Sequence, residues 1–455
     1  MNSTRRKFLH SGLSIAGMGA IGASTWLAGG MGELANADDL GDYKALVCVF
    51  LNGGNDGNNT LIPVDAAYGD YSRARGGLAL SKDSLTALGG SSAGHQFAIH
   101  PGIAPLAKLY QNKTLAWIAN MGTLVQPVTA SSILAMKGVT PPFLFSHIDQ
   151  TNIQQGWDGI SSNITGWAGR AIEALAPNLR HPLQLLSYNN NTTLLRGMVT
   201  PVTSAPKQYA NNFGPANLLK PTDTQLQALQ SISQLTSAND WDNIRLKNLK
   251  QTLSDAQSIA YALANVPKPA GNFGTDDLSI MLQQTVKLML AGKNAGLKRQ
   301  VFLVSWGSFD THSGQLGTSQ LNQDGQLATL GAGLDAFTQS IDGFGLTNNV
   351  ITFSMSDFAR TLQPVGGNGS DHAWGNHHFV MGGPVQGGSV LGTFPSLTLG
   401  GADDMDIAKK GRWAPTTSTD QLGATLMTWM GLNATQLNKV FPNLKNFSTP
   451  LLNFL

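Results

Sequence analysis

The chain has 455 residues, about three times the commonest size of a single domain, so it can hold one large α/β domain with insertions or two ordinary domains. Apolar residues make up 42% and charged residues 12% of the chain, which excludes a collagen, a coiled coil and a mostly disordered protein. The single cysteine, Cys48, excludes an intramolecular disulfide framework and a cysteine-based zinc site. The formal charge is +2 and falls to zero without the first 37 residues, so no nucleic-acid or anionic-membrane surface is expected.

The amino terminus has the pattern of an export signal. Arg5 and Arg6 precede an uncharged stretch, 11–30, that is rich in glycine and alanine. The paired arginines resemble the twin-arginine signal, and residues 35–37 (ANA) supply a small-x-small cleavage pattern. We expect a signal peptide over 1–37, export by the twin-arginine machinery to the periplasm or beyond, and a mature domain over 38–455.

A retained membrane anchor is the alternative reading of the same stretch, because about 20 apolar residues can span a bilayer. The many glycines favour cleavage, after which no stable membrane span is expected. Twin-arginine export carries folded proteins, which suits a protein that takes up a metal before it leaves the cytoplasm.

Short apolar runs alternate with amphipathic segments through the remaining chain. Such a pattern predicts an α/β fold, a doubly wound and largely parallel sheet with helices on both faces. The expected strands are 45–51, 115–119, 183–186, 301–306 and 350–354, and the expected helices are 103–110, 167–175, 224–234, 242–264, 278–291, 320–344 and 419–430. A stretch rich in Asn, Thr, Pro and Gly predicts an inserted cap region at about 187–275.

Polar residues follow three of these strands, where ligands of a parallel sheet bind. Asp56 follows the first, Asp310 and His312 the fourth, and Asp357 the fifth. Because neighbouring strands lie about 4.8 Å apart, aspartates at their ends can reach one metal ion or a pair.

A fourth segment, 371–378 (DHAWGNHH), adds Asp371, His372 and His377. Carboxylates and imidazoles without thiolates suit a divalent zinc, manganese, magnesium or calcium ion. Aspartates after strands also serve as helix N-caps, and Asp357 could be a cap alone. Two further motifs carry less weight: the glycines at 53–57 lack the spacing of a dinucleotide fingerprint, and GSSAG (90–94) has no strand leading into it.

Taken together, six motifs resemble a family of exported bacterial proteins, domain of unknown function 1501, in the alkaline phosphatase and sulfatase superfamily. They are FLNGGNDG (50–57) with Pro63, FSHID (145–149), WGSFDTH (306–312), SDFART (356–361), SDHAWG (370–375) and PTTSTDQ (415–421).

This resemblance implies an alkaline-phosphatase-like fold and a metal-assisted attack on a phosphate or sulfate ester by Ser, Thr or a modified Cys. In that comparison Asp56 and Asp357 look like metal aspartates, and Asp371 with His372 looks like the later histidine segment. The chain departs from the pattern at Phe358, where many members have His or Asn, and it lacks the Cys-x-Pro-Ser-Arg sulfatase site.

Ser146, beside His147 in the FSHID motif, is the nucleophile that we expect, and Arg360 could stabilise the transferring oxygens. The alternatives are that Ser146 caps a helix, that His147 packs, and that Arg360 lies on a surface. The sequence therefore predicts an exported metal-dependent hydrolase acting on a small-molecule or polymeric phosphate or sulfate ester. A noncatalytic periplasmic binding or assembly protein on the same fold is the alternative.

Overall fold

The computed structural model describes residues 41–175, 181–188, 191–200, 202–205, 207 and 212–455. The signal peptide expected over 1–37 lies outside these residues. Within them, no helix is long and apolar enough to cross a membrane.

A nine-stranded mixed sheet runs through the described chain, in the order β15-β5-β14-β11-β1-β10-β6-β7 with β16 paired to β5. Pairing is parallel everywhere except on the two sides of β14, where β11 and β5 are antiparallel neighbours. The strands are β1 (Lys44–Leu51), β5 (Leu115–Gly122), β6 (Leu185–Tyr188), β7 (Thr203–Ala205), β10 (Arg299–Trp306), β11 (Val350–Ser356), β14 (Asn376–Met381), β15 (Val390–Leu391) and β16 (Thr417–Ser418).

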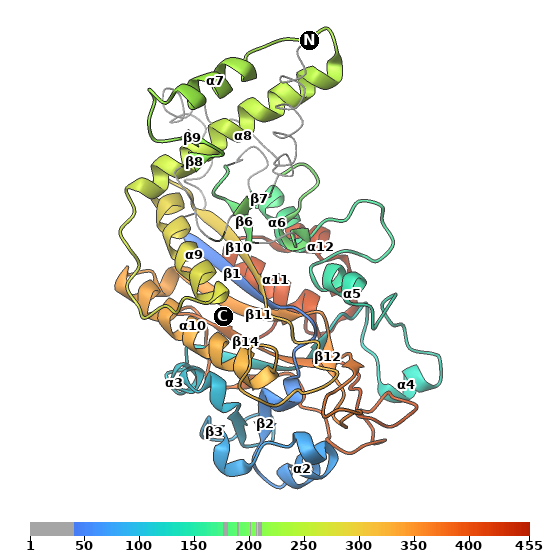
Figure 1. Ribbon diagram of the computed structural model, residues 1–455. Coiled ribbons are helices and arrows are strands. Elements are labelled where there is room, and N and C mark those ends of the chain that lie inside the picture. Colours follow the sequence, from blue (N-terminus) through green and yellow to red (C-terminus); the bar gives the residue numbers. More distant parts are fainter. Residues whose placement is uncertain (1–40, 176–180, 189–190, 201, 206, 208–211) are drawn as a thin grey trace.

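Helices cover both faces of this sheet (Figure 1). One face packs on α3 (Pro105–Gln111), α9 (Asp277–Asn294) and α10 (Gln323–Gly343). The other packs on α6 (Trp167–Leu175), α11 (Thr419–Met430) and α12 (Ala434–Val440). The doubly wound, largely parallel α/β fold is confirmed, as are all five expected strands and all seven expected helices, with shifts of a few residues at their ends.

Alternation along β1 explains the two-sided core. Val47 and Val49 lie in the apolar cluster of one face, and Cys48 and Phe50 in the cluster of the other. A parallel strand buried on both faces reads as a continuous apolar run, which is why β1 was visible in the sequence. Cys48 is a buried free thiol in this strand.

The expected cap region contributes to two parts of the fold. Its strand β7 pairs with β6 in the main sheet, while α7 (Thr224–Ser233) and α8 (Asp240–Ala264) pack together around Leu226 and Leu253. In Figure 1 these two helices lie at one end of the molecule, away from β11 and β14.

Strand register places the ends of β1, β10 and β11 side by side. Leu51, the last residue of β1, pairs with Trp306 of β10 on one side and with Ser356 of β11 on the other. The loops that carry residues 52–56, 307–312 and 357–360 therefore leave the sheet at one edge.

Candidate metal centre

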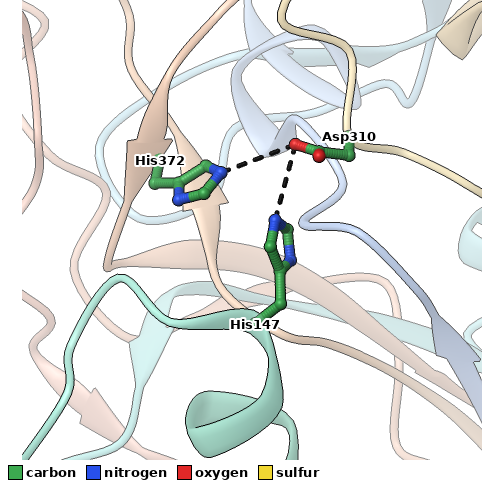
Figure 2. A group of neighbouring side chains, drawn as sticks. All are labelled: His147, Asp310 and His372. Carbon is green, nitrogen blue, oxygen red and sulfur yellow. Dashed lines mark ion pairs between the residues drawn. The ribbon is translucent and has the colours of Figure 1, made fainter.

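Imidazole rings from three separate segments meet at the carboxylate of Asp310. Its Oδ1 lies 3.0 Å from Nε2 of His312. The Nε2 atoms of His147 and His372 each lie 3.5 Å from the same oxygen. Figure 2 shows His147 and His372 turned toward that oxygen from two directions.

These four side chains come from three parts of the fold. Asp310 and His312 lie in the loop after β10, and His147 is the first residue of α5 (His147–Gln154). His372 lies in β13 (His372–Ala373), which pairs with β12 (Ala359–Arg360) immediately after β11. The site is open to solvent, since the side chains of Asp310 and His312 are 42% and 46% exposed.

Hydrogen bonds on the far side of two rings leave Nε2 free as an electron-pair donor. Nδ1 of His147 lies 2.7 Å from the carboxylate of Asp357. Nδ1 of His372 lies 3.0 Å from the carbonyl oxygen of Phe145, which can only accept, so this ring nitrogen carries the proton. Metal-binding histidines commonly have such a carboxylate or carbonyl partner on the second nitrogen.

Two further observations fit a metal ion. Nε2 of His147 is buried and has no hydrogen-bond partner among the described residues. The Nε2 atoms of His312 and His372 lie 2.9 Å apart, at hydrogen-bonding distance, so both nitrogens point into the same small space that a metal ion would occupy. In each of two overlapping groups, the possible ligand atoms all lie within 4.8 Å of one another: His147 with Asp310 and His372, and His312 with Asp371 and His372.

Arg360 holds Asp310 in place. Its guanidinium is fully buried and donates to Asp310 Oδ1 at 2.5 Å, to the carbonyl of Gly54 at 2.9 Å, to that of Ser370 at 3.2 Å and also to that of Gly53. These hydrogen bonds use four of the five N–H groups of the guanidinium, so Arg360 acts as a positioning residue for Asp310. Its contact with transferring oxygens stays a prediction.

Local charges favour the metal-binding forms of Asp310 and His372. Partial burial raises the pKa of Asp310, but the hydrogen bond and positive charge of Arg360 outweigh it and leave the pKa lowered. Partial burial and the charge of Arg360 lower the pKa of His372. The hydrogen bond with Asp357 raises the pKa of His147, so acid places on this ring a proton that competes with a metal ion.

The turn at Gly53 and Gly54 can be made only by glycine. Both have positive φ, +98° and +78°, and a Cβ on Gly53 would lie 2.6 Å from the backbone nitrogen of Asp310. A Cβ on Gly54 would lie 2.7 Å from the ring of Phe358. The backbone nitrogen of Gly53 also lies 3.1 Å from both carboxylate oxygens of Asp357. The two glycines thus let the three loops approach closely.

Asp56 is not part of this cluster. Its carboxylate is 1% exposed and forms an ion pair with the buried Arg75, and it also accepts hydrogen bonds from Gln315 at 2.6 Å and from the backbone of Asn58 at 2.9 Å. Breaking a buried pair of this kind typically costs about 3–5 kcal/mol. The described contacts of Asp56 are those of a structural ion pair.

His377 also lies apart from the cluster. It is buried in β14, where Nδ1 accepts a hydrogen bond of 3.0 Å from the backbone of Asn120 and the ring stacks on Phe394. Burial lowers its pKa to about 3, so the ring is neutral. The neighbouring His378 occupies the same strand and is equally buried.

Asp371 lies at the rim of the cluster. Its carboxylate is 3.9 Å from Nδ1 of His312 and 2.7 Å from the guanidinium of Arg412. Partial burial raises its pKa, but the hydrogen bond from the backbone of His372 and the charge of Arg412 leave the pKa lowered.

Ser146 is the N-cap of α5 and lies next to His147 along the chain. Its hydroxyl donates to the carboxylate of Asp149 at 2.6 Å, and the backbone nitrogen of Asp149 lies 3.5 Å from the same oxygen. The side chain is partly exposed, so it is accessible from solvent.

Phe358, Phe145 and Arg412 are site residues that the sequence did not reveal. Phe358 is buried, with its ring 4.6 Å from that of His147 and 4.4 Å from that of His372, so it braces both imidazoles. Arg412 donates to the carbonyl of His372 at 2.6 Å. Phe145 and Phe358 lie in the FSHID and SDFART motifs, but the motifs do not indicate that these residues contact the histidines; Arg412 lies in none of the motifs.

Comparison with known proteins identifies a family. Over residues 43–444 the sequence matches the family described as "Protein of unknown function (DUF1501)". No curated protein matches the chain.

The fold overlaps several solved structures only loosely. One is the lipoteichoic acid synthase LtaP from Listeria monocytogenes, with 9% identity over 94% of this chain and 78% of that chain and a TM-score of 0.32. Another is the PsFucS1 sulfatase from Pseudoalteromonas sp., with 9% identity over 89% of this chain and 76% of that chain and a TM-score of 0.33. A third is the phosphonate monoester hydrolase SpPMH from Silicibacter pomeroyi, with 10% identity over 86% of this chain and 73% of that chain and a TM-score of 0.31. With TM-scores this low, the overlaps support no conclusion about site or activity.

The partner of His147 should tune metal affinity. In Asp357→Asn the carboxylate that orients His147 is lost, and we expect the affinity for zinc, measured by isothermal titration calorimetry, to fall by about 10–100-fold. Asp65→Asn is a matched control, because Asp65 also pairs with a histidine, His95 at 3.0 Å, away from the cluster. Equal zinc affinity in wild type and Asp357→Asn would contradict a metal site that includes His147.

Proposed function

The chain belongs to the DUF1501 family of proteins of unknown function, and we propose that it is a metal-dependent hydrolase of phosphate or sulfate esters. The observation that carries the proposal is the convergence of His147, His312 and His372 on Asp310 at a solvent-accessible edge of the sheet. Zinc, manganese, magnesium or calcium would act there as a Lewis acid that polarises an ester oxygen.

The ligand roles follow from the contacts. His147, His372 and Asp310 would bind the ion, with His312 as a fourth ligand and Asp371 within reach of His312. Asp357 and the carbonyl of Phe145 would keep the two imidazoles in the metal-binding tautomer. Arg360 would keep Asp310 ionised and pointed at the ligand nitrogens.

Ser146 is our proposed nucleophile, because its partly exposed hydroxyl lies next to a ligand residue and its proton is held by Asp149. In the attack, Oγ would give its proton to Asp149 and bond to phosphorus or sulfur, while the bond to the alcohol oxygen breaks and that oxygen takes a proton from solvent. Water would then hydrolyse the seryl ester and release phosphate or sulfate. A hydroxyl needs a nearby base or metal to act in this way.

Export is the second part of the proposal. Arg5 and Arg6, the uncharged stretch that follows them and the ANA sequence at 35–37 support a twin-arginine signal and a periplasmic or secreted mature protein. An ester substrate in that compartment and the export machinery would then be the partners of this chain.

Two substitutions at position 146 separate nucleophile from helix cap. Ser146→Ala removes both functions, while Ser146→Asn keeps the cap but has no hydroxyl. We expect both variants to retain metal and to hydrolyse an aryl phosphate or aryl sulfate slower by a factor on the order of 10³, with a loss of about 1 kcal/mol in unfolding free energy only for Ser146→Ala.

Full activity of Ser146→Asn would remove Ser146 from the mechanism. A wild-type protein that hydrolyses neither ester when loaded with each of the four metals would favour the noncatalytic binding protein. Removal of the metal with a chelator, followed by its return, is the control for metal dependence in the active case.

Replacing both Arg5 and Arg6 with lysine should leave uncleaved precursor in the cytoplasm, because the twin-arginine pathway depends on that pair. Cell fractionation followed by immunoblotting measures the distribution. Unchanged export of the double variant would contradict the twin-arginine route.

A further inference from the structure

Exposed apolar side chains gather on the segment that carries His147. Of the 15 large hydrophobic residues that are exposed in the described part of the chain, seven lie between positions 134 and 160. They are Leu134, Met136, Val139, Phe143, Phe145, Ile148 and Ile160. Concentration of apolar surface in so short a segment is typical of a binding surface.

Three of these side chains, here called the apolar rim, lie around the start of α5, the helix that His147 begins: Phe143, Phe145 and Ile148. Phe145 accepts the hydrogen bond from His372 through its carbonyl, and Ile148 directly follows His147. Their exposed fractions are 61%, 38% and 77% in chain order. Two members of the rim are therefore adjacent to residues that we propose to hold the metal, Phe145 through its carbonyl and Ile148 along the chain.

Internal hydrogen bonds hold the rim in place. Gln150, which is fully buried, donates to the carbonyls of Pro142 at 2.9 Å and Phe143 at 3.2 Å. Its own oxygen accepts from Thr123 at 3.0 Å. On the other side, the guanidinium of Arg412 lies 5.2 Å from the centre of the Phe145 ring. A surface that is ordered before binding loses less entropy when a ligand arrives.

The charge of this segment points to an uncharged occupant. Between residues 134 and 160 the charged side chains are Lys137, Asp149 and Asp158, so the segment has no cluster of positive charge for an anionic membrane or an acidic peptide. Aromatic and aliphatic side chains beside a reaction centre bind apolar groups by removing them from water.

We propose that the apolar rim binds the alcohol portion of the ester and that the substrates are phosphate or sulfate esters of apolar, alkyl or aryl-alkyl, alcohols. This inference rests on the proposed function, because the rim would receive the group that leaves during hydrolysis. Phe143 and Ile148 are then specificity residues, whereas Phe145 also positions His372 through its backbone.

A series of 4-alkylphenyl phosphates and sulfates, with alkyl chains from ethyl to octyl, tests the proposal on the metal-loaded full-length mature protein. We expect kcat/KM to rise by about twofold to fourfold per added methylene group, the upper value being that of full burial. In the double variant Phe143→Ser, Ile148→Ser this dependence should flatten, while the metal content equals that of wild type.

Trp241→Ser is the matched control, because Trp241 is 72% exposed and lies on α8, outside the rim and the metal centre. Its chain-length dependence should equal that of wild type. If kcat/KM does not depend on alkyl chain length, or if it depends on chain length equally in wild type and the double variant, the apolar rim does not bind the alcohol portion. The hydrolase proposal would remain intact in that case. Absence of hydrolysis for every ester would overturn both.

Discussion

The buried guanidinium of Arg360 is the contact on which the arrangement at this sheet edge depends. A buried charge must be paired and hydrogen-bonded, and Arg360 meets that requirement with the turn after β1, with Ser370 and with Asp310. The loops after β1, β10 and β11 are thereby tied together at one edge. Burial raises the pKa of Asp310, but the hydrogen bond and charge of Arg360 leave it lowered, and the same charge adds to burial in lowering the pKa of His372. Arg360 therefore favours the carboxylate and the neutral imidazole that a metal ion needs.

Much of the framework could be predicted from the sequence because it rests on periodicity. Strands buried on both faces, such as β1 and β10, are continuous apolar runs, and their register makes residues far apart in the chain neighbours. From this register we expect Asp310 and His312 at the same edge of the sheet as the ends of β1 and β11, and the structure places His372 beside them. The antiparallel strand β14 is not evident from the sequence, because NHHFVM predicts metal ligands whereas the chain forms a buried strand that includes His377.

What the sequence could not supply was the partner of each polar side chain. Asp56 and Asp310 both follow strands, yet Asp56 is neutralised by Arg75, 19 positions away, and only Asp310 faces imidazoles. Likewise, Asp357 contacts His147 rather than lying bare at the strand end. Choosing between ligand, orienting group and ion pair needs side-chain geometry in three dimensions, which spacing along the chain does not contain.

The central claim is that one divalent ion binds where the imidazoles of His147 and His372 meet Asp310. Anomalous diffraction from crystals of the mature protein grown with zinc, recorded on both sides of the zinc absorption edge, tests it most directly. We expect one strong peak about 2.0–2.2 Å from Nε2 of both histidines and from a carboxylate oxygen of Asp310. Absence of a peak at this position under saturating zinc, or a strong peak bound only by other residues, would contradict the account.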